Sequence, residues 1–87
     1  MKIKKELIRR DIAGDAVLVP VGKTVYDSNG LFILNEVGAF LWDRLADAQS
    51  EEHLLAVLLA EYEVAKDTAR KDVQEFLEKL RKLEILE

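Results

Sequence analysis

The chain has 87 residues and a formal net charge of −4, and 34% of its residues are charged while 49% are hydrophobic. These values are typical of a single folded domain covering residues 1–87, and they exclude a disordered chain. The lack of cysteine excludes disulfides and thiolate metal sites. No apolar run is long enough to span a membrane, so we expect a cytoplasmic location.

The charge is distributed unevenly along the chain. Residues 24–65 contain one arginine and eight acidic residues, whereas residues 66–87 contain six residues of each sign. A protein that binds duplex DNA usually has a net basic recognition helix. The balanced C-terminal segment therefore argues against nucleic acid as a partner.

Two strands are predicted near the N-terminus. Residues 6–12 fit either a first strand or an extended arm, and the sequence Ala13-Gly14-Asp15 turns the chain. Residues 16–21 are rich in β-branched side chains and predict a strand, with Pro20 at a sheet edge or a strand end.

The third predicted strand is unusually apolar. It consists of Leu31, Phe32, Ile33 and Leu34, and it follows the turn-like sequence Asp-Ser-Asn-Gly at residues 27–30. A strand with one buried face alternates apolar and polar residues, whereas this strand is apolar at every position. We therefore expect both of its faces to be covered, either by the protein itself or by another molecule.

Three helices are predicted after the strands. The first begins at Asn35, a favourable N-cap, and has the apolar spacing i, i+3, i+4 and i+8 from Val37. Ser50 caps the second helix, and the third begins near Asp67 or Thr68. Strands that precede helices predict an α+β domain.

The sequence offers no constellation of catalytic residues. His53 is the only histidine, and it lacks the second histidine or positioned carboxylate that a general base or metal ligand needs. Ser28 and Ser50 are the only serines, in a turn and a cap. The sequence therefore predicts a protein that is not an enzyme and that has no catalytic site, no metal site and no cofactor.

Peptide binding is the remaining prediction. An apolar strand at a sheet edge offers unpaired backbone groups to an extended peptide, and the third helix would form the other wall of a groove. On a helical wheel, one flank of this helix lies about 80–140° from Ala69 and suits a peptide with an apolar anchor and acidic neighbours. The flank consists of Leu77, Arg70, Arg81 and Gln74. Alternatively, Leu77 only widens the core and the two arginines are solvated.

Several segments together resemble the PqqD-like family of precursor-peptide recognition elements. The first is Arg9-Arg10-Asp11 followed by Gly14-Asp15 and an apolar strand. The second is Leu34-Asn35-Glu36-Val37-Gly38-Ala39 followed by Leu41-Trp42. The third is Asp72-Val73 with Phe76-Leu77 and Leu80 in the last helix. The resemblance covers nearly the whole chain, and the Leu-Asn-Glu junction at residues 34–36 is its strongest part.

This resemblance implies a winged helix-turn-helix-like fold, in which an N-terminal three-stranded antiparallel sheet precedes three helices. Such proteins are non-catalytic, and they bind the leader segment of a ribosomally made precursor peptide as an added strand. They then present the peptide to a modifying enzyme, often of the radical S-adenosylmethionine type. By position, the implied peptide-binding residues are Leu31, Phe32, Ile33, Leu34, Arg70, Val73, Gln74, Leu77 and Arg81.

One departure from the family pattern concerns the end of the last helix. Family members commonly have a glycine there before two apolar residues, whereas Glu84 precedes Ile85-Leu86 in this chain. We therefore expect the helix to continue further.

Two other functions fit the same sequence pattern. A winged-helix DNA-binding regulator shares the fold, and a self-associating module would cover residues 31–34 with a second copy in a homodimer.

Overall fold

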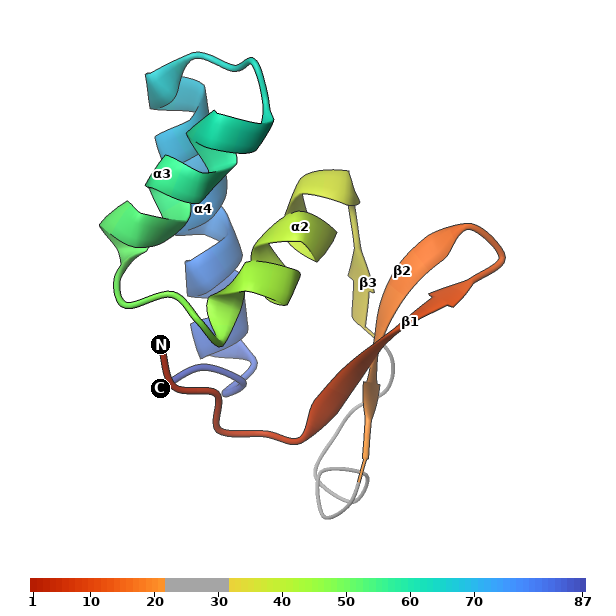
Figure 1. The fold of residues 1–87 in the computed structure, drawn as a ribbon. Coiled ribbons are helices and arrows are strands. Elements are labelled where there is room, and N and C mark those ends of the chain that lie inside the picture. The colour runs from red at the N-terminus through yellow and green to blue at the C-terminus, as the bar shows by residue number, and fades with distance from the viewer. Residues whose placement is uncertain (22–31) are drawn as a thin grey trace.

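The computed structural model describes residues 1–21 and 32–87, and Figure 1 shows that their three helices lie to one side of a small sheet. The strands come first, followed by the helices, which confirms the predicted α+β class. The elements are β1 (Leu7–Ile12), β2 (Asp15–Pro20), β3 (Phe32–Leu34), α2 (Glu36–Leu45), α3 (Glu51–Glu61) and α4 (Lys66–Lys82).

The sheet is antiparallel and has the strand order β1-β2-β3. Residues 6–12 therefore contain a strand, not an extended arm. A two-residue loop, Ala13-Gly14, joins β1 to β2, and both of its residues have positive φ (52° and 88°). Positive φ at both positions matches the twist of a hairpin with a type I′ turn. This arrangement leaves β3 at one edge of the sheet.

The two faces of β3 have different surroundings. Phe32 and Leu34 are paired with Leu18 and Ala16 of β2, so their side chains share the face that packs on the helices. Leu34 is 7% exposed on this face. Ile33 points to the opposite face and is 63% exposed. The residues described here thus cover only one face of this apolar strand.

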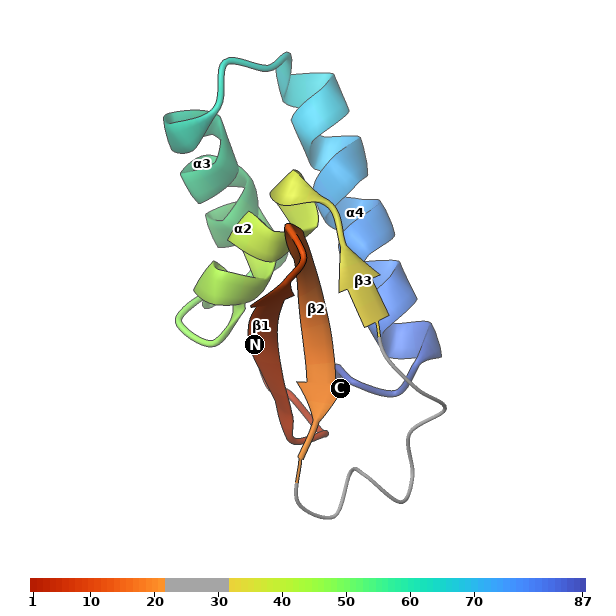
Figure 2. The ribbon, with the colours of Figure 1, turned by 90° about the vertical axis from the view of Figure 1, so that its right-hand side faces the viewer.

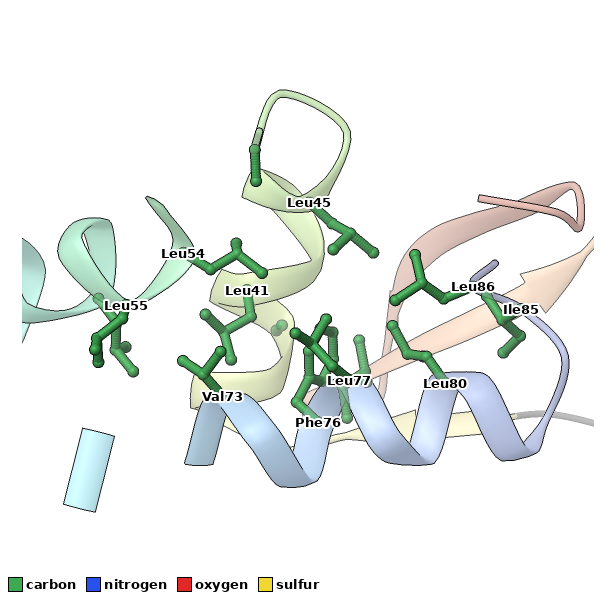
Figure 3. Packing of buried hydrophobic residues seen from close by; sticks show 14 of the residues in the cluster. Leu41, Leu45, Leu54, Leu55, Val73, Phe76, Leu77, Leu80, Ile85 and Leu86 are labelled. Carbon is green, nitrogen blue, oxygen red and sulfur yellow. The ribbon is translucent and has the colours of Figure 1, made fainter. Parts of the chain in front are cut away.

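One hydrophobic cluster joins β2 and β3 to all three helices. In Figure 3, Val73, Leu77 and Leu80 project from α4 towards Leu41 and Leu45 of α2. All five side chains are fully buried. The apolar spacing of α4 therefore forms the core face that its sequence predicts.

Side-chain caps fix the starts of two helices, as predicted. The Asn35 Oδ1 accepts a hydrogen bond from the Gly38 N–H (2.7 Å), and the Ser50 Oγ accepts one from the His53 N–H (3.1 Å). The cap at Asn35 lets β3 pass directly into α2. Helix α4 begins at Lys66, slightly before the predicted start, and its N-cap residue Ala65 makes no side-chain hydrogen bond.

Helix α4 ends at Lys82, so the expectation that it continues past Glu84 is wrong. Glu84 adopts a left-handed conformation (φ 59°), and its N–H donates to the Arg81 carbonyl (3.0 Å). The Ile85 N–H donates to the Leu80 carbonyl (2.8 Å), which completes a Schellman motif. Burial of Ile85 against the cluster offsets the cost of a left-handed residue that is not glycine.

The segment after α4 runs back beside the N-terminal residues, and Figure 1 shows the two ends close together. Ile3 forms a β-bridge with Leu86, and the Lys4 N–H donates to the Ile85 carbonyl (2.7 Å). This pairing fixes the C-terminal end of α4 relative to β1.

Candidate functional site

A cavity of about 540 Å³ lies between β3 and α4. Figure 2 shows these two elements side by side and running in opposite directions. No other strand of the described residues pairs with the far side of β3, so its edge faces this cavity. The lining residues are Asp15, Phe32, Ile33, Leu34, Asn35, Val37, Gly38, Leu41, Asp72, Glu75, Phe76 and Lys79.

The floor of the cavity is apolar and closely packed. Leu34, Leu41 and Phe76 belong to the hydrophobic cluster, and Phe32 packs against it. A Cβ atom at Gly38 would lie 3.1 Å from the Asn35 Oδ1, closer than side chains normally approach. Glycine at this position therefore lets β3 and the start of α2 meet at one end of the cavity.

The rim of the cavity is charged. The Lys79 Nζ lies 5.0 Å from the centre of the Phe32 ring, in a cation–π contact that joins α4 to β3. Three acidic residues, Asp15, Asp72 and Glu75, also line the cavity. The site thus combines an apolar floor, an open strand edge and side chains of both charges.

Three of the four predicted strand residues lie at this cavity. Phe32, Ile33 and Leu34 line it, and Leu31 lies outside the described residues. Peptide binding by these residues stays a prediction.

The α4 wall of the cavity differs from the predicted flank. The five α4 residues expected there, which are Arg70, Val73, Gln74, Leu77 and Arg81, are all absent from the lining of the cavity. Val73 and Leu77 are fully buried in the core, so the alternative interpretation of Leu77 as a core residue is correct. Arg70 donates a hydrogen bond to Glu52 of α3 (2.6 Å).

The physical reason for this difference is that a helical wheel has two flanks beside its apolar stripe. The wheel alone does not show which flank faces β3. The structure places Asp72, Phe76 and Lys79 there, about 280–340° from Ala69 at 100° per residue. The contact between Lys79 and Phe32 could not be inferred from either segment alone.

The hydrogen-bonded pair Arg70–Glu52 shifts the pKa values of both side chains. The hydrogen bond from Arg70, followed by its positive charge, lowers the pKa of Glu52 below its usual value. The same hydrogen bond and the carboxylate charge raise the pKa of Arg70. Glu52 is exposed and Arg70 is partly exposed, so the pair connects α3 to α4 at the surface, and neither residue lines the cavity.

A second cavity, of about 480 Å³, lies between the sheet and the start of α2. Its charges are largely paired, because Arg9 makes ion pairs with both Asp43 and Asp11. Phe40 and Tyr62 also line it, in an edge-to-face contact with ring centres 5.4 Å apart. Internal pairing of this kind leaves fewer charges for a ligand than the cavity at β3 offers.

Residues 1–21 and 32–87 contain no membrane-spanning helix and no group of three metal ligands. None of the helices there is both long and apolar enough to cross a membrane. Nor do histidine, cysteine and acidic side chains in those ranges gather in a group of three that could hold a metal ion.

Solved structures with the same fold contain bound leader peptides. One, described as TbiB1 in complex with the TbiA(beta) leader peptide, is 30% identical, with a TM-score of 0.76; the match covers 100% of this chain and 95% of that one. Another, described as lasso peptide synthetase B1 complexed with the leader peptide, is 23% identical, with a TM-score of 0.72 and coverage of 97% and 93%.

Comparison with curated proteins gives no match. Residues 15–86, however, match the family described as coenzyme PQQ synthesis protein D (PqqD). The matched range begins at the first residue of β2 and includes every later strand and helix. The chain therefore belongs to the PqqD family.

Proposed function

We propose that this chain is a non-catalytic adaptor that binds the leader segment of a ribosomally made precursor peptide. It acts in the cytoplasm and presents the peptide to a modifying enzyme, which we expect to be of the radical S-adenosylmethionine type. The observation that carries this proposal is the edge of β3 beside an apolar cavity. The 30% identical TbiB1 structure, which contains a leader peptide, supports it.

The proposed mode of binding is strand addition. An edge strand has N–H and C=O groups on its far side that a peptide backbone can pair with. Because side chains alternate along the added strand, half of them would enter the cavity over Phe76. The other half would lie beside Ile33, on the face where that side chain is 63% exposed. A bound peptide would thus cover the apolar strand from its open edge.

Chemical-shift mapping tests this mode directly. The ¹⁵N-labelled protein is titrated with the leader segment of the precursor peptide encoded beside its gene. We expect amide shifts at residues 32–34 and on the cavity-lining flank of α4. A scrambled leader of the same composition is the control. Shifts confined to the opposite flank, around Arg70 and Arg81, would move the binding site to the α4 residues predicted from the wheel.

Backbone pairing is tested with modified peptides. N-methylation at alternate leader residues removes the N–H groups that face β3, so one of the two alternating patterns should abolish binding while the other has little effect. If both patterns bind equally well, strand addition is excluded. Titration with duplex DNA tests for DNA binding, whose affinity should fall as salt is added. The molecular mass of the protein alone, measured over a series of concentrations, tests for a homodimer.

A further inference from the structure

The charges around the cavity at β3 are separated along its length. The Lys79 ammonium lies over Phe32, at the beginning of β3. Asp72 comes seven residues before Lys79 on α4, which corresponds to about 10 Å along a helix axis. Since α4 and β3 run in opposite directions in Figure 2, Asp72 lies towards the Asn35 end of the strand.

Two further carboxylates line the cavity on the Asn35 side of Lys79. Asp15 precedes Ala16, and Ala16 is paired with Leu34, so Asp15 is level with Asn35. Glu75 lies on α4 between Asp72 and Lys79. Among the described residues, one end of the cavity is therefore acidic, and Lys79 is the cation at the other end.

The three carboxylates of the cavity at β3 have no charged partner among the described residues. Lys79 contacts the Phe32 ring although Glu75 is four residues away on the same helix, the usual spacing of a helical ion pair. This pattern contrasts with the second cavity, where Arg9 is paired with two acids.

We infer that the cavity at β3 selects its peptide by the positions of the charged residues along the added peptide strand. A lysine or arginine of the peptide lies at the Asn35 end, facing Asp15, Asp72 and Glu75. An apolar side chain lies over Phe76, and an acidic or neutral residue lies beside Lys79. The inference rests on the proposed function, and it reverses the acidic peptide expected from Arg70 and Arg81.

Pairing direction determines the order of these residues in the peptide. Antiparallel pairs are somewhat more stable per residue than parallel pairs. A peptide antiparallel to β3 has its N-terminal part at the Asn35 end, because β3 runs from Phe32 to Leu34. The selected segment therefore has its basic residue on the N-terminal side of its apolar anchor.

A selection experiment with random peptides tests this rule. The probe is an mRNA-displayed library of random twelve-residue peptides, selected against the immobilised full chain. We expect lysine and arginine to be enriched about threefold or more on the N-terminal side of an apolar residue, since exposed charge pairs each contribute up to about fivefold in affinity. A double variant, Asp72→Lys with Glu75→Lys, should enrich aspartate and glutamate at the same positions.

A matched control separates local from total charge. Glu63→Lys with Glu78→Lys makes the same change in net charge at exposed positions that do not line the cavity. This control should keep the preference of the wild type, and circular dichroism establishes that all three proteins are folded. If the Asp72/Glu75 variant and the wild type select the same charge, the inference is overturned although peptide binding stands.

Failure of the proposed function gives a different result. Peptides selected by the wild type are added to ¹⁵N-labelled protein, and the shifted amides are assigned. Shifts outside residues 32–34 and the cavity-lining flank of α4, or a library from which nothing is enriched, would overturn strand capture and the charge rule together.

Discussion

At the scale of single residues, a substitution at Ile33 tests peptide binding without disturbing the fold. Its side chain is 63% exposed, so Ile33→Asp should leave the fold intact. It should weaken leader binding about fivefold, because an apolar cross-strand pair with the added peptide contributes up to about 1 kcal/mol. Fluorescence anisotropy with a labelled leader measures the change in Kd.

Ile12 provides the matched control for this variant. It is 48% exposed on β1 and does not line the cavity, although its β2 partner Asp15 does. Ile12→Asp should bind the leader as the wild type does. Equal losses of affinity in both variants would show that the effect is not local to β3.

Glu84 is a second position where the choice of a single residue measurably changes the free energy of unfolding. Its left-handed backbone (φ 59°) is unfavourable for any residue with a side chain. We expect Glu84→Gly to raise the free energy of unfolding by about 1 kcal/mol, measured by urea denaturation. Glu78→Gly, at an exposed position in the middle of α4, should lower it by about the same amount. A destabilised Glu84→Gly variant would contradict the Schellman motif.

The Glu52–Arg70 pair predicts a pH dependence of stability. The pKa of Glu52 is lowered in the folded state by the hydrogen bond from Arg70. The stabilisation that the Glu52 carboxylate contributes is therefore complete above the pKa that Glu52 has in the unfolded chain. It is lost as the pH falls through the lowered pKa of Glu52 in the folded state.

This dependence is measured by comparing urea midpoints of wild type and Glu52→Gln at pH 7 and near pH 2. The variant should be less stable at neutral pH, and the difference should shrink in acid. Glu61→Gln, at another exposed position of α3, should show no such convergence. A constant difference at all pH values would exclude linkage through this carboxylate.

At the scale of elements, the sequence predicts most boundaries because the deciding interactions are local. Asn35 and Ser50 bond to the first turns of their own helices, within three residues along the chain. The end of α4 depends instead on the contact of Ile85 with the core and with Lys4. Those contacts are long-range, which explains why the sequence pattern placed the helix end too late.

Helix α4 lacks a side-chain cap, so its start can be improved. Ala65 has the extended backbone of an N-cap (φ −64°, ψ 142°) but no oxygen to accept a hydrogen bond. Ala65→Ser should stabilise the protein by about 0.5–1 kcal/mol in thermal or urea unfolding. Ala60→Ser, inside α3, should instead destabilise it slightly, by about 0.5 kcal/mol. No gain from Ala65→Ser would mean that α4 frays at its start.

At the scale of the whole molecule, the order of strands and helices was sufficient to predict the fold class. It was not sufficient to predict which flank of α4 faces β3. That choice depends on how α4 packs against α2 and α3, through side chains such as Leu77 and through the Arg70–Glu52 bond. The apolar strand was therefore found from sequence, whereas its charged partners Asp72 and Lys79 required the structure.

Leader binding should stabilise the entire chain, because the peptide binds only the folded state. With leader at about 100 times its Kd, the gain is about 2.7 kcal/mol. For a domain of this size, that corresponds to a rise in Tm of roughly 10–20 °C, measured by circular dichroism. The scrambled leader should leave Tm unchanged, and an equal rise with both peptides would indicate non-specific association.

In the proposed mode of binding, the length of β3 also affects how long the peptide stays bound. Three residues give a short ladder of backbone hydrogen bonds, so most of the affinity must come from side chains in the cavity. For a complex with a Kd of about 1 μM and an association rate of about 10⁶ M⁻¹ s⁻¹, the peptide leaves about once per second. A residence time on this scale would allow one copy of the protein to deliver many precursor chains in succession, as a reusable carrier does.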